Sequence, residues 1–392
     1  MHHSVNYSLY KEPLFNNGLV KHALLQEKIN SIKSQKKFEV RTAGYSAQKR
    51  EIYQLTIGQG PVCVMLWSQM HGDEPTGTRA FFDLFNFLQA DDEHNTLRQL
   101  ILSKCTLHFI PVLNPDGAEI NERRNAQGID INRDFLQQQS PEARLLTQLH
   151  QQIQPEFGFN MHDQGALWSV QGTQKPAAIS LLAPPADDRA TINSNRLKAI
   201  KLIAGIYEML SVSIPGQIGK WSEDFEPRAF GDNFQLLGTA TLLIEAGGYS
   251  NDENRQYVRE LNFKILLYAL EQIATAGYHR QNAAIYHQIP RNTKSLFHII
   301  IKNVVLQTSA GNVNVDIGLN HDHVFDVMPL PQQELYTVQD IGDLSIYNAY
   351  KSIDAQGSKI EQVIDLCDIA NFTVVDETQK RYCFVNGRLV CQ

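Results

Sequence analysis

Residues 62–77 read VCVMLWSQMHGDEPTG, a strand-like run followed by a polar turn and the start of a helix. The apolar run Val62–Trp67 is typical of a strand that is buried on both faces of a sheet. Pro75 is a favoured first residue of a helix. His71 and Glu74 therefore stand beyond the carboxyl end of a strand, where open α/β sheets bind their ligands.

His71 and Glu74 carry side chains that Zn²⁺ accepts as ligands, and together they would supply half of a tetrahedral site. A His-x-x-Glu spacing is also common in polar turns that bind nothing. The metal hypothesis therefore depends on partners elsewhere in the chain.

Expected strands and helices alternate through the first two thirds of the chain, and this alternation predicts an α/β fold in which helices sandwich a mixed sheet. The strands are expected at 38–42, 51–57, 62–67, 106–113, 156–161, 179–182 and 239–245. The helices are expected at 23–35, 77–89, 93–103, from 141 onward, 192–210 and 252–275.

The sequence pattern changes after about residue 283, where short β-like runs alternate with Gly, Asn and Asp. Asn386-Gly387 between two such runs is a strong hairpin signal. We therefore expect an N-terminal arm and helix at 1–36, an α/β domain at 37–282 and a smaller β-rich domain at 283–392. The β-rich domain could serve oligomerisation, substrate access or stability, and its residues do not decide among these.

The 392-residue chain has a formal net charge of −7 and no basic stripe, which argues against a nucleic-acid partner. Its apolar runs are too short to cross a membrane, and no secretory signal is visible at the N-terminus. Five scattered cysteines indicate neither a disulfide framework nor a metal knuckle. We therefore expect a reduced compartment, the cytoplasm, and leave the oligomeric state open.

Two later residues extend the metal hypothesis. His162 follows an expected strand and could supply a third ligand, which would leave the fourth position of a catalytic zinc site to water. Glu245 ends an apolar strand, where burial raises a carboxyl pKa toward the range that suits a general base. The alternatives are a hydrogen-bonded histidine at a strand end and a charged residue that caps a strand.

Residues 123–134 read RRNAQGIDINRD and concentrate guanidinium and amide groups in one loop. A guanidinium binds a carboxylate through two hydrogen bonds and also stabilises a developing oxyanion. Asp130 could accept the second ring N–H of a ligating histidine and so orient it. The alternative is a solvated polar loop.

Taken in their order along the chain, the segments that contain His71 and Glu74, residues 123–134, His162 and Glu245 resemble the zinc carboxypeptidase family (M14-type metallopeptidases, similar to carboxypeptidase A). The resemblance covers about residues 50–275. The resemblance implies an α/β/α sandwich around a mixed, mainly parallel eight-stranded sheet. It also implies that His71, Glu74 and His162 bind Zn²⁺, and that Glu245 acts as general base and then as general acid.

The same resemblance implies roles in substrate binding. Arg123 would polarise the scissile carbonyl and stabilise the oxyanion, and Arg124 is the less favoured neighbour because only Arg123 keeps the Arg-x-Asn spacing. Asn132 and Arg133 would hold the terminal carboxylate of the substrate, and Asp130 would orient His71. Residues 231–234, which include Asp232, resemble the segment that lines the specificity pocket.

The chain departs from the family pattern at two places. The family's substrate-closing tyrosine precedes the catalytic glutamate, but residues 220–230 contain no tyrosine. Tyr249 or Tyr207 could replace it only with an unusual loop geometry. Asp134 stands where Asn is commoner and adds negative charge beside the expected carboxylate clamp.

The sequence therefore predicts a zinc-dependent hydrolase of an amide (peptide) bond near a free carboxylate, with a peptide or an N-acyl amino acid as substrate. A zinc-dependent deacylase or amidase of N-acyl amino acids or cell-wall peptides is the first alternative. A non-catalytic binding protein with a vestigial site is the second, and it is disfavoured because ligands, arginine and base are all present.

Overall fold

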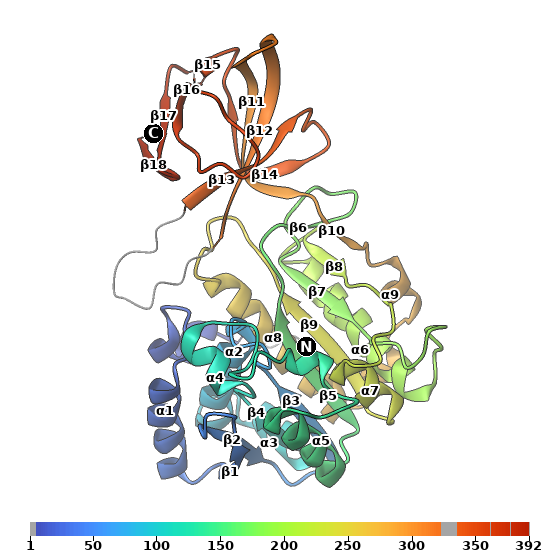
Figure 1. Cartoon of the computed structure of the whole chain (residues 1–392). Helices are drawn as coiled ribbons and strands as arrows, with labels where there is room; N and C mark the ends of the chain where they lie inside the picture. Colours follow the sequence, from blue (N-terminus) through green and yellow to red (C-terminus); the bar gives the residue numbers. More distant parts are fainter. Residues whose placement is uncertain (1–4, 323–334, 361, 377, 392) are drawn as a thin grey trace. The chain divides into compact units, whose positions relative to one another are not determined.

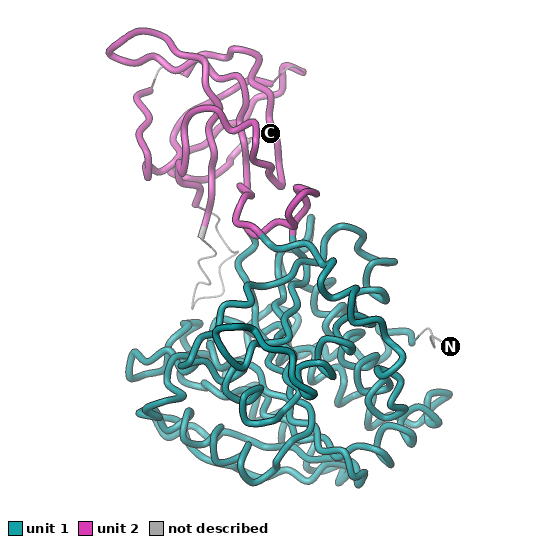
Figure 2. Tube along the Cα trace, turned by 90° about the vertical axis from the view of Figure 1, so that its right-hand side faces the viewer, with its two compact units in different colours: residues 1–166, 177–292 teal, residues 167–176, 293–392 magenta. Residues whose placement is uncertain are grey.

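The computed structural model describes residues 5–322, 335–360, 362–376 and 378–391. The chain divides into two compact units (Figure 2). The first comprises Met1–Ala166 and Ala177–Asn292, and the second comprises Leu167–Pro176 and Thr293–Gln392. A short segment from the middle of the chain thus belongs to the C-terminal unit, while the expected three-part functional division stays a prediction.

The first unit is built on one eight-stranded sheet (Figure 1). Its strands are β1 (Glu39–Tyr45), β2 (Glu51–Ile57), β3 (Val62–Trp67), β4 (Cys105–Ile110), β5 (Phe157–Asp163), β7 (Ile179–Leu182), β8 (Ile218–Lys220) and β9 (Ala240–Ala246). Their order is β1-β2-β4-β3-β5-β9-β7-β8. The pairs β3/β4, β3/β5, β5/β9 and β7/β8 are parallel, and the other three are antiparallel. The predicted mixed, mainly parallel sheet is confirmed.

Helices cover both faces of this sheet, as the alternating pattern predicts. They are α1 (His22–Gln35), α2 (Thr76–Gln89), α3 (Asn95–Lys104), α4 (Pro115–Ile120), α5 (Pro141–Ile153), α6 (Ser194–Ser211), α7 (Phe230–Leu236), α8 (Gln256–Ala274) and α9 (Ala284–Gln288). Strand β3 shows the layering, because Val64 and Leu66 join a core with residues of α2, α6 and α8, whereas Met65 and Trp67 join a core with residues of α5 and α7.

The start of α8 differs from the predicted position. The sequence predicts a helix from residue 252, but α8 begins at Gln256 because Arg255 has a left-handed backbone, with φ of 50°. The Asp252 carboxylate instead accepts the N–H groups of Tyr257 and Val258, each at 3.0 Å, and so caps the helix. The turn that follows β9 is therefore longer than expected.

The second unit is β-rich, as predicted. Its larger sheet has the order β13-β12-β11-β14, with β15 paired to β11, and the smaller sheet has the order β16-β17-β18. The bounds are β6 (Trp168–Val170), β10 (Asn292–Lys294), β11 (Leu296–Thr308), β12 (Gly311–Asp322), β13 (Leu335–Gly342), β14 (Asn348–Asp354), β15 (Lys359–Ile360), β16 (Phe372–Val375), β17 (Arg381–Val385) and β18 (Arg388–Cys391). Strand β6 pairs with β10.

Two expectations about the second unit have clear outcomes. Asn386 and Gly387 have φ of 47° and 79° and join β17 to β18, as the hairpin signal predicts. Residues 298–301 and 304–306 are two of the short β-like runs that follow residue 283, and both belong to the single strand β11. Its pairing with β12 shifts register between Ile301 and Val304. This irregularity accommodates the polar residues between the two runs.

The cysteines differ from the expected reduced set. Cys63, Cys105 and Cys367 are free, but Cys383 is disulfide-bonded. No pattern in the sequence indicated this bond, because five scattered cysteines define no pairing. A cytoplasmic location thus stays a prediction.

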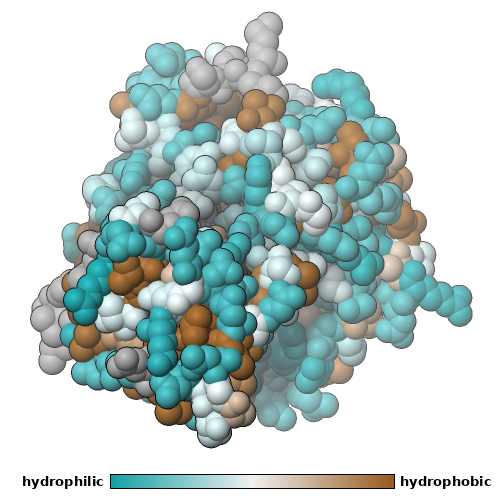
Figure 3. Space-filling view, turned by 90° about the horizontal axis from the view of Figure 1, so that it is seen from above, coloured by the Kyte–Doolittle hydropathy of each residue, from teal (hydrophilic) through white to brown (hydrophobic). Residues whose placement is uncertain are grey.

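The surface in Figure 3 carries mostly hydrophilic side chains, with apolar ones in small groups between them. Among the helices of the described residues, none combines the length and the apolar composition that a membrane crossing requires.

Candidate metal centre

The turn between β3 and α2 is shaped by a close approach of two backbones. At Gly72, a Cβ atom would lie 2.0 Å from the carbonyl carbon of Gly117 in α4, so that only glycine fits. The Glu74 N–H donates to the carbonyl oxygen of His71 at 3.3 Å and closes the turn. The sequence His71-Gly72-Asp73-Glu74 therefore presents its histidine and its glutamate to the same side.

His162 at the end of β5 completes a buried group with this pair. The Nδ1 atom of His71 lies 2.8 Å from Glu74 Oε1, and the Nδ1 atom of His162 lies 2.7 Å from Glu74 Oε2. One ligand atom from each residue lies within 4.8 Å of the other two. All three side chains are buried, and the structure thus brings together the three predicted ligands.

Two imidazole nitrogens and one carboxylate form the donor set of a catalytic zinc site. Burial alone would raise the pKa of Glu74, but His71 and His162 outweigh it and hold the pKa below its usual range. Glu74 is therefore an anion, which is the form that binds a metal. The residues present fit Zn²⁺.

Asp130 touches this group from the side that faces away from Glu74. Its Oδ1 atom lies 3.1 Å from His71 Nε2, which leaves His71 Nδ1 to face Glu74. The same oxygen accepts the N–H of Asn132 at 3.0 Å and caps the short helix η3 (Ile131–Arg133). The predicted contact between Asp130 and His71 is thus present.

Arg123 lies at the solvent side of the group, with 43% of its side chain exposed. Its Nε–H donates to Asp130 Oδ2 at 3.1 Å, and its Nη1 lies 3.2 Å from Glu74 Oε1. A cation in this position can reach both the metal ligands and a bound substrate. Arg124, by contrast, donates to the carbonyl oxygen of Gly128 at 2.9 Å.

Glu245 reaches the group from the neighbouring strand. It pairs with His162 in the parallel register of β5 and β9, and it is only 8% exposed. Burial, and after it the nearby Glu74 carboxylate, raise the pKa of Glu245 well above its usual range. A raised pKa makes a carboxylate a stronger base, which suits a group that accepts a proton and then returns it.

The predicted carboxylate clamp lies in the loop and helix that follow Asp130. Asn132 Oδ1 accepts the N–H of Phe230 at 3.0 Å, and Arg133 Nη1 donates to the carbonyl oxygen of Asn132 at 2.9 Å. Arg133 lines a cavity of about 520 Å³ together with Asp130 and Arg124. Arg133, Arg124 and Asp130 thus lie around one opening, whereas Asn132 is not among the residues that line it.

Asp134 also lines this cavity, but its carboxylate is turned toward α5. It accepts the N–H of Gln139 at 2.9 Å and the N–H of Ser140 at 2.7 Å. The Ser140 hydroxyl in turn accepts the N–H of Ala143 and caps the helix. The Asp134 carboxylate thus stabilises the start of helix α5.

Asp232 and Tyr249 have different surroundings. Asp232 is 9% exposed and accepts the N–H of Glu226 at 3.1 Å, and its burial raises its pKa to about 7. The Tyr249 ring packs against Tyr257 in α8, with 4.7 Å between ring centroids. That contact belongs to the start of α8 rather than to the metal group.

Glu226 and Arg228 were not predicted as site residues. The Glu226 carboxylate lies 3.1 Å from Arg133 Nε and also accepts two hydrogen bonds from Arg228, at 2.9 and 2.7 Å. Both residues belong to segment 220–230, which lacks the family's tyrosine. The sequence signal that could have indicated them is the pair of opposite charges on either side of Pro227.

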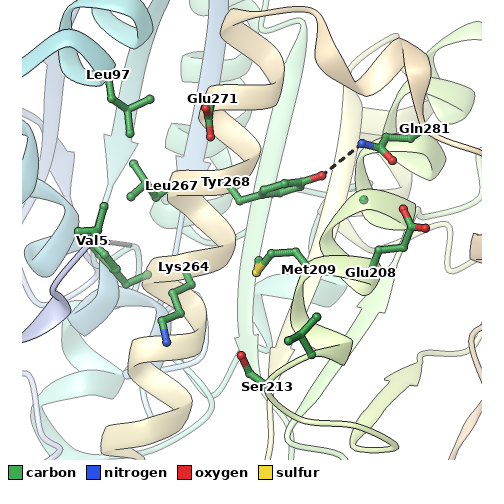
Figure 4. Close-up of a pocket in the computed structure, with 13 residues that line it drawn as sticks. Val5, Leu97, Glu208, Met209, Ser213, Lys264, Leu267, Tyr268, Glu271 and Gln281 are labelled. Atoms are coloured by element: carbon green, nitrogen blue, oxygen red, sulfur yellow. Dashed lines mark hydrogen bonds between the residues drawn. The ribbon is translucent and has the colours of Figure 1, made fainter. Parts of the chain in front are cut away.

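A separate cavity of about 620 Å³ lies between α6 and α8 (Figure 4). The Tyr268 hydroxyl reaches toward Gln281, whose Nε2 donates to it at 3.3 Å. No predicted site residue lines this cavity.

Comparisons with known proteins show similarity to zinc carboxypeptidases. The profile of the zinc carboxypeptidase family matches residues 26–208, a range that holds all three predicted ligands but ends before Glu245. Carboxypeptidase SOL1 of Arabidopsis thaliana is 42% identical over 72 residues, which are 18% of this chain and 15% of that protein. The carboxypeptidase N catalytic chain of Homo sapiens is 29% identical over 116 residues, which are 24% of this chain and 25% of that protein.

A solved metallo-carboxypeptidase from Burkholderia cenocepacia has a similar fold, with a TM-score of 0.54 and 17% sequence identity over 66% of this chain and 70% of that chain. The chain spans a quarter or less of the length of these curated relatives. The matched family and the donor set together identify the metal as Zn²⁺.

Proposed function

Residues 26–208 belong to the zinc carboxypeptidase family, and on that premise we propose that this protein is a zinc-dependent hydrolase of an amide bond near a free carboxylate. One observation carries the proposal. The ligands His71, Glu74 and His162 converge beside Glu245, which is paired with His162 across two parallel strands. Ligands alone would fit a structural metal, whereas a buried carboxyl group with a raised pKa beside them fits hydrolysis.

Bound Zn²⁺ would supply Lewis-acid chemistry here, with a lowered pKa of its water, toward ~7, and polarisation of the scissile carbonyl. Glu245 would take a proton from the attacking water and return it to the leaving amine. Its raised pKa suits both steps, because a carboxylate that holds a proton more strongly is a better base toward water and can carry that proton to the leaving amine.

Arg123 would stabilise the negative charge that develops on the carbonyl oxygen. Its contacts with Asp130 and Glu74 hold the guanidinium at the metal group before substrate arrives, so that little reorganisation is needed. Asp130 would keep His71 in its ligating orientation.

Asn132 and Arg133 would bind the free carboxylate of the substrate. The planar guanidinium of Arg133 suits a two-bond contact with a carboxylate. Arg133 and Arg124 line the same cavity as Asp130, which itself touches the metal group. We therefore place the substrate's charged end in this opening and its scissile bond at the metal.

A deacylase or amidase with the same metal is the second candidate. One observation favours it: the Arg133 guanidinium is already paired with Glu226, so a terminal carboxylate must compete for it. A substrate that is anchored mainly by its acyl group would not meet this competition.

A hydrolysis screen tests both candidates. The zinc-loaded protein is assayed with a peptide that has a free C-terminus, its amidated counterpart, N-acyl amino acids and cell-wall peptides, each with and without chelator. We expect cleavage of the free-carboxylate peptide, loss of cleavage with chelator and recovery with added Zn²⁺. Cleavage of N-acyl amino acids alone would select the deacylase, and no cleavage of any substrate would select a binding protein.

A further inference from the structure

Arg255 lies behind the metal centre, at the end of the turn that links β9 to α8. Its left-handed backbone places it just before α8, and its side chain is 22% exposed. A non-glycine residue in this conformation is uncommon and indicates a local requirement. The contacts of its guanidinium identify that requirement.

The guanidinium joins the ends of two neighbouring strands. Its Nη1 donates to the carbonyl oxygen of Ala246 at 2.9 Å, and its Nη2 donates to the carbonyl oxygen of Gln164 at 2.9 Å. Ala246 follows Glu245 on β9, and Gln164 lies two residues after His162 on the β5 side. The arginine thus continues the cross-strand bonding at the point where the sheet ladder ends.

A third contact extends this connection to the helix that follows Glu74. Arg255 Nη1 lies 3.2 Å from Asp163 Oδ2, and the same oxygen accepts both the N–H and the hydroxyl of Thr76, at 3.3 and 2.6 Å. The Asp163 N–H donates to Glu74 Oε2 at 3.2 Å. One buried carboxylate therefore connects the arginine to two of the three ligand-bearing segments.

We propose that Arg255 is a positioning residue that holds the strand ends of His162 and Glu245 in register for catalysis. This inference rests on the proposed function. Only a planar guanidinium offers donors in the directions of two carbonyl groups and a carboxylate at once. A lysine at this position has one compact ammonium group and can satisfy only part of the set.

The size of the effect follows from the sensitivity of catalysis to geometry. A displacement of ~1 Å at reacting groups lowers turnover by about 100-fold, and loss of a residue that orients metal ligands weakens metal binding by about 10- to 100-fold. For Arg255→Ala we therefore expect a kcat about 100-fold lower, a KM close to that of the wild type and zinc affinity about 10-fold lower.

The test measures zinc affinity by chelator competition, together with kcat, KM and the unfolding midpoint, in Arg255→Ala and Arg255→Lys. The matched control is Arg280→Ala, which removes an exposed arginine outside the site. Guanidinium ion at low millimolar concentration should restore part of the turnover of Arg255→Ala and should not change Arg280→Ala. A residue with only a structural role would lower the folded fraction without changing the zinc affinity of the folded chain.

Wild-type zinc affinity in folded Arg255→Ala, or unchanged kcat, would overturn the proposal. If Arg255→Ala does not fold, Arg255→Lys decides by the same measurements, with a smaller loss of affinity expected and equality with the wild type as the refuting result. If the wild type cleaves nothing, the proposed function is wrong, while the comparison of zinc affinities still tests the positioning role.

Discussion

Replacing Asp232 by Asn should make the stability of the first unit less dependent on pH. Asp232 is 9% exposed, and its burial raises its pKa to about 7 from the usual value of 3.8. Between these two pH values the folded chain holds a proton that the unfolded chain has lost. The free energy of unfolding of the wild type therefore falls as the pH rises through this window.

The magnitude follows from the two pKa values. A difference of about 3 corresponds to ~4 kcal/mol at 1.36 kcal/mol for each pKa unit, and this is an upper limit because the fold can relax around the ion. The Glu226 N–H, which donates to Asp232 at 3.1 Å, limits the cost of ionisation, and the amide oxygen of Asn can accept the same bond. We expect the free energy of unfolding of Asp232→Asn, measured relative to that of the wild type, to rise by about 2–4 kcal/mol between pH 4 and pH 8.

Urea unfolding at pH 4, 6 and 8 measures this difference at constant zinc concentration, with each variant compared with the wild type at the same pH. Asp340→Asn is the control, because Asp340 lies on β13 and belongs to the second unit, whereas Asp232 belongs to the first. A gap between Asp232→Asn and the wild type that stays constant from pH 4 to pH 8 would refute the reasoning. A gap that widens as the pH falls would contradict its sign.

Four further changes test the metal centre. Glu245→Gln should keep one zinc per chain and lose hydrolysis, and full turnover would refute its role as a base. Arg133→Ala should raise KM for a substrate with a free carboxylate but not for its blocked counterpart; an equal change for both would place the clamp elsewhere. Asp130→Ala should weaken zinc binding about 10- to 100-fold by chelator competition, and unchanged affinity would exclude its orienting role. Gly72→Ala should lose zinc and stability together, because its Cβ would lie 2.0 Å from the Gly117 carbonyl carbon, and a zinc-loaded variant as stable as wild type would contradict this.

Much of the fold could be predicted from the sequence because it depends on local patterns. The run Val62–Trp67 is apolar at every position, which requires burial on both faces, and helices supply that cover. Asn386-Gly387 specifies its hairpin through backbone conformations that few other residues adopt. The start of α8 was predicted less well, because the left-handed backbone of Arg255 depends on contacts distant in sequence.

The candidate site, too, was predicted only in part. Spacing and order along the chain pointed to His71, Glu74, His162 and Glu245, because each stands where a strand ends. The pairing of Arg133 with Glu226 was not predicted, since it joins η3 to a segment about a hundred residues further along the chain. Nor did any pattern indicate that Tyr249 packs against Tyr257.

The sequence by itself predicted which groups would carry the chemistry: the proposed ligand pair in the turn after β3, and the histidine and the carboxylate at two later strand ends. Only the tertiary structure decided how these groups meet. Parallel pairing of β5 with β9 sets His162 beside Glu245, and Arg255 joins the ends of these strands. The physical reason is that residue type and periodicity are local properties, whereas strand order and register arise from the packing of the whole sheet.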